Sequence, residues 1–397
     1  MAKTANIWPD SPAFRFVLIM GLVNLFGDMT YEGGGSINGQ FLGNLGASAA
    51  TISIVAGLGE FFGYSLRSVA GYVADKSGRY WLVTLVGYVI NLFAVPAMAL
   101  AGSWQIAALL IFAERTGRAI RKPSVEAMLS YTTGSLGKGW VYAVNTALDE
   151  TGATVGPLVV ALVLFFKGSY QTAYAMLLIA VIFALISLLA ARIAFPVPSK
   201  LEQGHTATAK GFTAAYWLYM AAGALFASGL LSFELISYHF SATNTVSGYL
   251  IPVLLAFSTG SGVIANLVLG RLFDRFGLPV VLVAVLLSAL FAPIVFAGGL
   301  LAVWAAMPLW GIGYATQDTL LKAIVAGVLP EGRRNLAFGL FYTGYGGGWL
   351  IGSIAMGELY EHSRLGLIVF AVAAQLLSLP LFVLAQRQSR TSPRAAK

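Results

Sequence analysis

Six charged side chains lie within thirteen consecutive residues of this chain. The segment ERTGRAIRKPSVE, residues 114–126, contains Glu114, Arg115, Arg118, Arg121, Lys122 and Glu126. At about 100° per residue, an α-helix places all six within about 140° of its surface. They therefore form one stripe, which can face water or charged partners while the rest of the helix faces apolar neighbours.

The sequence around this stripe is apolar enough to place it inside a membrane. There, each arginine or acid at a helix centre costs roughly 2.5–3.5 kcal/mol unless it has a partner or borders water. Two interpretations remain open. Arg121 and Lys122 are more typical of a salt-bridged inner gate or a headgroup contact. Arg115 and Arg118 lie deeper with Glu114, where they could line a substrate cavity and meet an anionic group or a proton-carrying carboxylate.

Carboxyl and amide groups occur at the same depth in other apolar runs. They belong to Asn24, Asp28 and Glu32 on one helix face, to Glu60, and to Asn145 and Asp149 on another face. A carboxyl group in a low-dielectric cavity can take up and release a proton near neutral pH. We therefore predict proton coupling at Asp28, Glu32, Asp149 and Glu60, with Asn24 and Asn145 in the substrate cavity. The alternative is that these acids only neutralise Arg115 and Arg118, or bond backbone groups freed by the glycines 33–35.

The second half of the chain contains a similar but smaller set of charges. Asp318 and Lys322 form an i,i+4 pair at a place that matches Arg118 and Lys122. We predict that this pair lies in the lower cavity or at the inner gate. Glu234 is equally consistent with an outer gate and with an anchor at the membrane interface.

The composition indicates that the chain is embedded in a lipid bilayer. The chain has 397 residues, of which 58% are apolar and 10% charged, and a mean hydropathy of +0.80. Soluble domains carry about 25% charged residues. The chain has no cysteine and only three scattered histidines, so we expect no thiol chemistry, no metal site and no cofactor. We attribute the net charge of +8 to membrane topology and expect no nucleic-acid partner.

Twelve apolar runs are long enough to cross the hydrocarbon core. They are residues 14–41, 48–70, 81–101, 104–130, 139–166, 172–194, 213–238, 247–270, 279–299, 302–328, 336–360 and 365–386. The polar segment 196–212 divides them into an N-terminal bundle, 1–195, and a C-terminal bundle with its tail, 213–397. With both termini in the cytoplasm, the outer loops hold only Lys167 and Arg364 among the basic residues, as the positive-inside rule requires.

One short motif repeats between the halves, and a second lies in the first half. GYVADKSGRY, residues 71–80, corresponds to GRLFDRFG, residues 270–277. GATVGP, residues 152–157, is a glycine-proline motif in the fifth run. The first motif and the last resemble the helix 2–3 and helix 5 signatures of the major facilitator superfamily, in a prokaryotic branch similar to drug and metabolite antiporters. The resemblance implies twelve helices in two pseudo-symmetric six-helix bundles. It also implies gate roles for Asp75, Arg79, Asp274, Arg275, Gly152, Gly156 and Pro157.

These features predict a secondary transporter that works by alternating access. The leading expectation is proton-coupled export of a small organic molecule. The alternatives are a proton symporter that takes up an organic anion through Arg115 and Arg118, and a membrane sensor that transports nothing. We expect no enzymatic activity, a monomer in contact with membrane lipid, and a location in the cell inner or plasma membrane. Glycine triplets at 33–35 and 346–348 are expected to interrupt their helices and to permit bending or close helix approach. The alternative is that they only allow tight packing.

Overall fold

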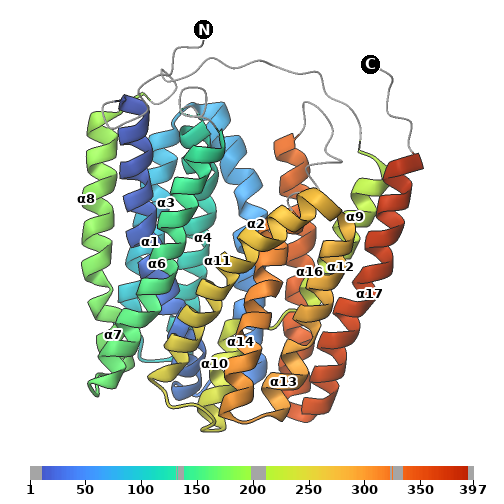
Figure 1. The fold of residues 1–397 in the computed structure, drawn as a ribbon. Helices are drawn as coiled ribbons and strands as arrows, with labels where there is room; N and C mark the ends of the chain where they lie inside the picture. Colours follow the sequence, from blue (N-terminus) through green and yellow to red (C-terminus); the bar gives the residue numbers. More distant parts are fainter. Residues whose placement is uncertain are drawn as a thin grey trace.

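The computed structural model describes residues 11–130, 132, 138–197, 212–321, 324 and 334–391. Every regular element in these residues is a helix, which confirms the prediction of an all-α protein. The long helices run roughly side by side between two ends of the molecule (Figure 1). The beginning of the first helix and the end of the last lie at the same end.

The first half of the chain forms a group of helices that pack mainly on one another. Its elements are α1 (Pro12–Asn44), α2 (Ala49–Ser77), α3 (Tyr80–Ala97) with the short 3₁₀ helix η1 (Met98–Leu100), α4 (Trp104–Ser130), α6 (Lys138–Phe165), α7 (Tyr170–Met176) and α8 (Leu178–Ala194). Serine hydroxyls cap the N-termini of α1 and α2 by accepting a hydrogen bond from a backbone N–H of the first turn. Gly78 ends α2 in the left-handed conformation, at φ 63°.

The second half forms the corresponding group. Its elements are α9 (Ala214–Ser228), α10 (Phe233–Ala242), α11 (Leu250–Phe276), α12 (Leu278–Ala289), α13 (Phe291–Ala297), α14 (Leu300–Ala315), the π-helical η3 (Thr316–Leu321), α16 (Arg334–His362) and α17 (Arg364–Thr391). Within the described residues, helices occur in all twelve predicted apolar runs. The predicted boundary at 196–212 lies almost entirely outside the described residues, so the domain division stays a prediction.

Nine helices in the described part of the chain are long and apolar enough to cross a membrane. The helices α4 and α16 fall outside this set, and α14 has only 16 residues. The α4 helix is the one that carries the charged stripe. The chain is therefore a multi-pass membrane protein, while the number of twelve crossings remains a prediction.

The helix breaks do not lie where the sequence suggested. The helices α1 and α16 run without interruption through both glycine triplets, so the expected interruptions there are wrong. Instead, the seventh predicted run is broken between Ser228 and Phe233. Two carbonyl groups at this break are satisfied by side chains, because Gln375 donates to Gly229 and Trp310 donates to Leu231, each at 2.9 Å.

The two halves touch mainly through three pairs of helices, α1 with α10, α2 with α16, and α6 with α11. In Figure 1, the two groups lie closest at the end opposite the described chain ends. The contact of α1 with α10 is very close, since a Cβ atom on Gly39 would lie 1.9 Å from the carbonyl oxygen of Glu234. This contact places Glu234 of the second half beside the first half.

At the same end, a carboxyl group joins the two halves. Glu361 of α16 accepts a hydrogen bond of 2.9 Å from the backbone N–H of Ala50 in the first turn of α2. This bond and one from the Ser48 side chain hold the pKa of Glu361 below its ordinary value. The hydrogen bond between Ala50 and Glu361 therefore stabilises this arrangement fully at pH values above the ordinary glutamate pKa, about 4.3. This stabilisation is lost as the pH falls through the lowered pKa of Glu361, because the protonated carboxyl group no longer gains from the contact.

We therefore expect Glu361→Gln to loosen this end of the molecule. The chain has no cysteine, so a single cysteine at Ser53, which is buried between α2 and α16, reports access to the contact. Because the thiolate is the reacting species, the variants are compared at one neutral pH, where labelling of that cysteine should be faster in the Glu361→Gln variant. Glu358→Gln, which changes an exposed acid one turn earlier, should leave the rate unchanged. Equal rates in all variants would contradict the role of Glu361.

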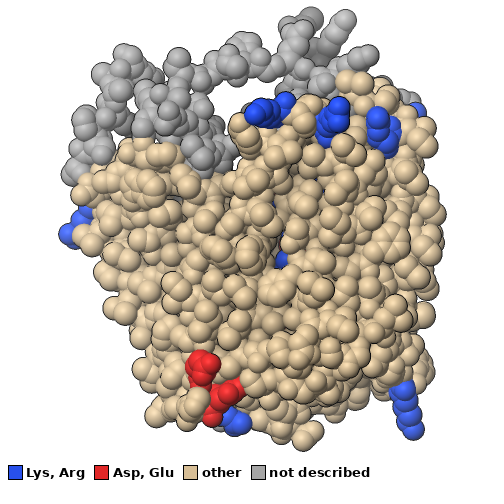
Figure 2. Space-filling model, turned by 180° about the vertical axis from the view of Figure 1, so that it is seen from behind, with Lys and Arg blue, Asp and Glu red and all other residues tan. Residues whose placement is uncertain are grey.

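The surface agrees with a membrane environment. In Figure 2, most basic side chains lie near the end that holds the described chain ends, whereas acidic side chains and a few basic ones lie near the opposite end. Between them, the described residues of this face form a broad band almost free of charge. A basic side chain is visible in a narrow opening near the centre of this band.

Candidate functional site

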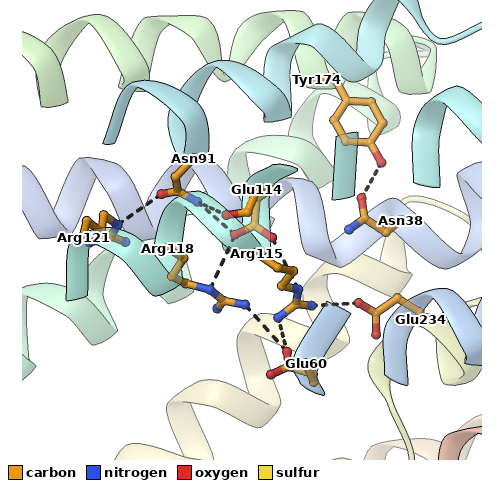
Figure 3. Close-up of polar contacts among 9 residues, drawn as sticks. All are labelled: Asn38, Glu60, Asn91, Glu114, Arg115, Arg118, Arg121, Tyr174 and Glu234. Carbon is orange, nitrogen blue, oxygen red and sulfur yellow. Dashed lines mark hydrogen bonds and ion pairs between the residues drawn. The ribbon is translucent and has the colours of Figure 1, made fainter. Parts of the chain in front are cut away.

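The charged stripe of α4 meets carboxyl groups from both halves. Arg115 forms ion pairs with Glu60 of α2, with Glu114 at 3.3 Å and with Glu234 of α10 at 3.0 Å (Figure 3). The side chains of Arg115 and Glu234 are only 13% and 8% exposed. One guanidinium therefore connects α4 and α2 in the first half to the N-terminal turn of α10 in the second.

Arg118 shares two of the same carboxyl groups. Its Nη2 lies 3.6 Å from Glu60 and its Nε lies 3.5 Å from Glu114. Its guanidinium also lies over the ring of Tyr31, 4.6 Å from the ring centre. Three carboxylates are thus shared by two guanidinium groups. We call Glu60, Glu114, Arg115, Arg118 and Glu234 the central cluster.

One turn further along α4, Arg121 belongs to a second set of contacts. Its guanidinium donates to Asn91 at 3.2 Å and to the Tyr88 hydroxyl at 3.1 Å, and it lies 3.7 Å from Asp28. Asn91 in turn donates to the Glu114 carboxylate at 3.0 Å. Asn91 of α3 therefore links Arg121 to the central cluster (Figure 3).

A chain of polar side chains continues from there across α3, α1 and α6. The Tyr88 hydroxyl donates to Asn24 at 2.6 Å, and Asn24 donates to Asn145 at 2.9 Å. Asn145 then donates to Oδ2 of Asp149 at 3.1 Å. The other carboxyl oxygen of Asp149 is buried and has no hydrogen-bond partner among the described residues. The chain thus ends on a carboxyl group with no ion pair to the described residues.

Glu32 differs from the other acids at this depth. It makes no hydrogen bond or ion pair with any described residue, although Arg118 acts on it electrostatically. Among the described residues of this region the acids are Asp28, Glu32, Glu60, Glu114, Asp149, Glu150 and Glu234, and the bases are Arg115, Arg118, Arg121 and Lys122. Seven described carboxyl groups therefore face four described basic groups, and neither Glu32 nor Asp149 has an ion pair with a described residue.

The structure brings most of the predicted cavity residues together, but it shows no ion pair among the described residues of the predicted gate loops. Arg79, Asp274 and Arg275 are exposed, and none of them forms an ion pair with a described residue. The side chains of Asp75 and Asp318, and the whole of Lys322, lie outside the described residues. Gate roles for these residues remain predictions.

The glycines of the GATVGP motif lie inside the first half, at the contact of α6 with α1. A Cβ atom on Gly152 would lie 2.1 Å from the carbonyl oxygen of Leu25, and one on Gly156 would lie 2.2 Å from that of Met29. Pro157 lies within the same unbroken helix. This close approach brings α6, with Asn145 and Asp149, against α1.

We expect Gly156→Ala to destabilise the protein, because the backbone atoms that its methyl group would meet cannot rotate away. Overpacking of this kind costs about 1–3 kcal/mol. Gly35→Ala on α1 is the control, since a Cβ atom there would meet nothing within 4 Å. Thermal unfolding in detergent should show a lower melting temperature for Gly156→Ala only. An equal melting temperature for both variants would mean that α1 and α6 can separate freely.

Sequence reasoning missed three parts of this site. It left the partner of Glu234 open, and it did not consider Tyr88 and Asn91, which lie in the apolar run 81–101. A buried amide in such a run needs a partner, so Asn91 could have been noticed. Nothing in the sequence indicates that Arg115 reaches a residue more than a hundred positions away.

Comparisons with known proteins agree with this fold. The sequence model of the major facilitator superfamily matches residues 17–316 and 212–397. An uncharacterized protein of Mycobacterium tuberculosis is 33% identical over 97% of this chain and 96% of its own length. An uncharacterized MFS-type transporter of Methanocaldococcus jannaschii is 26% identical over 89% of this chain and 90% of its own length.

A mutant of the nucleoside transporter NupG has a similar structure, with a TM-score of 0.72 at 13% identity, over 95% of this chain and 100% of that chain. At this identity the likeness concerns the fold alone. With the fold and the buried charges, these matches define a multi-pass membrane transporter. The chain belongs to the major facilitator superfamily.

Proposed function

We propose that the protein is a proton-coupled secondary transporter that exports a small organic molecule by alternating access. The observation that carries this proposal is the surplus of carboxyl groups, with Glu32 and Asp149 lacking an ion pair to any described residue. An unpaired charge at membrane depth costs roughly 2.5–3.5 kcal/mol. A carboxyl group avoids this cost by binding a proton, so these two side chains are suited to carry protons.

The contact of Arg115 with Glu234 supports a link between protonation and movement of the halves. Opening the closed end must separate α10 from α1 and α4, and therefore Glu234 from Arg115. Arg115 can then pair more fully with the carboxyl groups of the first half. We propose that proton binding or release at Glu32 changes this balance and so favours one orientation of the carrier.

Antiport is favoured over anion symport by the engagement of the two central arginines. Uptake of an organic anion through Arg115 and Arg118 requires both to be available, whereas each is already paired with carboxylates. The resemblance of GATVGP to the helix 5 signature of antiporters points the same way. We further propose that the protein works as a monomer in the cell inner membrane with both termini in the cytoplasm.

Reconstitution into proteoliposomes with an imposed pH gradient tests this function. Antiport predicts that the substrate moves against the direction of proton flow, and the internal pH should change only when substrate is present. Movement of substrate with protons would instead identify a symporter. Transport that is the same with and without a proton gradient would refute proton coupling.

A further inference from the structure

Arg67 is a basic residue of α2 that the central cluster does not use. It lies 18 residues after Ala49, within the candidate membrane span Ala49–Ala74, and so about 27 Å along the helix from its start. No acidic side chain of the described residues forms an ion pair with it, and its Nε is buried without a hydrogen-bond partner among them. Nε of Arg115 also lacks a hydrogen bond among the described residues, but Arg115, Arg118 and Arg121 each form at least one ion pair with an acidic side chain.

The surroundings of Arg67 come from both halves. Its guanidinium lies over the ring of Tyr64, 4.8 Å from the ring centre. The Tyr64 hydroxyl accepts a hydrogen bond from Gln317 of η3, and Gln317 accepts one of 2.9 Å from Tyr345 of α16. Tyr64 also stacks on Tyr342, with 7° between the ring planes. Arg67 therefore lies at the contact of α2 with the second half.

This position is difficult to explain by interaction with lipid headgroups. A snorkelling arginine extends its guanidinium to water or to phosphate groups, whereas part of the Arg67 guanidinium is buried against Tyr64. Tyr64 and Gln317 are themselves only 7% and 4% exposed. A basic group kept at membrane depth without an acidic partner indicates a functional site.

We propose that Arg67, together with Tyr64, Tyr342 and Gln317, binds the anionic group of the transported molecule, which is then a small organic carboxylate or phosphate. A guanidinium stacked on a ring keeps its N–H donors in its own plane, where they can bind a carboxylate or phosphate through two hydrogen bonds. Tyr342, which stacks on the face of Tyr64 that Arg67 does not cover, offers the apolar contact for a planar substituent. This inference rests on the proposed transport function and names its substrate class.

The subsite also reassigns the anion contact that the sequence suggested. Arg115 and Arg118 are occupied by carboxylates, and Arg67 takes their place. Since Gln317 belongs to the second half, an anion held by Arg67 would lie where both halves can contact it. Binding there would make the relative position of the halves depend on the substrate.

Binding of three matched probes to the purified full-length protein tests this proposal. Benzoate and phenyl phosphate carry the anionic group on a planar ring, and benzamide is the neutral counterpart of benzoate. Both anions should raise the melting temperature of the wild-type protein in lipid-free detergent, and benzamide should not. Arg67→Gln should weaken binding of the anions about tenfold or more, because it removes hydrogen bonds to a charged group. Arg271→Gln, which changes an exposed arginine of α11, should leave binding unchanged.

The stability of the variant distinguishes binding from a structural role. Removal of an unpaired guanidinium should leave the melting temperature without ligand unchanged or higher, whereas removal of one partner of a buried ion pair should lower it. Equal effects of benzoate and benzamide, unchanged anion binding by the Arg67→Gln variant, or a large loss of its stability would each overturn the proposal. An effect of anionic lipid vesicles alone would identify a headgroup site and would also overturn it.

This outcome is separable from that of the transport function. If anions bind through Arg67 but substrate movement ignores the proton gradient, the subsite stands and proton coupling fails. If proton-driven transport of a neutral molecule is unaffected by Arg67→Gln, coupling stands and the anion subsite fails.

Discussion

Replacing Arg115 with methionine should abolish transport and lower stability by about 3–5 kcal/mol, the usual cost of removing one partner from a buried ion pair. The effect should be large because this guanidinium serves Glu60, Glu114 and Glu234 together. Without it, Glu60 and Glu114 share Arg118 alone, and Glu234 has no ion pair with a described residue. Thermal unfolding in detergent and transport in proteoliposomes measure the two effects.

Two further variants show whether the contact of Arg115 with Glu234, which joins the two halves, is responsible for the losses of transport and stability. Arg115→Lys keeps the charge but lacks the planar fork that reaches Glu60 and Glu234 at once, so it should be intermediate. Adding Glu234→Gln to the methionine variant should restore part of the stability, because one uncompensated charge is removed, and should not restore transport. If Arg115→Met were as stable and active as the wild type, the central cluster would have no mechanistic role.

Replacing Glu32 with glutamine should abolish proton-driven transport while exchange of substrate across the membrane continues. The amide has nearly the shape of the carboxyl group but cannot bind and release a proton. Glu32 has no ion pair with a described residue, so its replacement should change stability little. Measurement of driven uptake and of substrate exchange in the same proteoliposomes separates coupling from transport itself.

Asp149→Asn tests whether the second carboxyl group without an ion pair to a described residue takes part in proton coupling. If the polar chain from Tyr88 to Asp149 conducts protons, this variant should also lose driven transport. Glu126→Gln is the matched control, because Glu126 belongs to the same charged stripe as Arg115 but is exposed. Full driven transport by both Glu32→Gln and Asp149→Asn would remove the two residues from the coupling mechanism.

Local patterns in the sequence predicted most of the fold. Apolar runs of about twenty residues indicate membrane helices because the bilayer sets their length, and each run contains helix in the described residues. Helix breaks were predicted poorly. Glycine triplets lower helix propensity, but packing against neighbouring helices kept α1 and α16 continuous. The break before Phe233 depends on Gln375 and Trp310, which are distant in sequence.

The sequence predicted which residues belong to the candidate site, but it did not predict which of them form ion pairs with each other. Helical periodicity placed the charges of α4 on one face, and this follows from backbone geometry alone. Which acid each arginine contacts depends on the packing of α2, α3 and α10 around α4. For this reason the sequence favoured Arg115 and Arg118 as anion ligands, whereas the structure surrounds both with carboxylates and places none of the described carboxylates on Arg67.

The most direct test of proton-coupled alternating access is a pair of distance measurements between spin labels, since the cysteine-free chain allows labels at chosen sites. One pair, at Asn44 and His362, spans the end where the halves meet, and the other, at Arg79 and Arg275, spans the opposite end; all four residues are exposed. A shift from alkaline to acidic buffer should change the two distances in opposite directions in the same molecules, and Glu32→Gln should remove most of this response. Two distances that stay fixed at every pH, or that change independently of each other, would contradict the account.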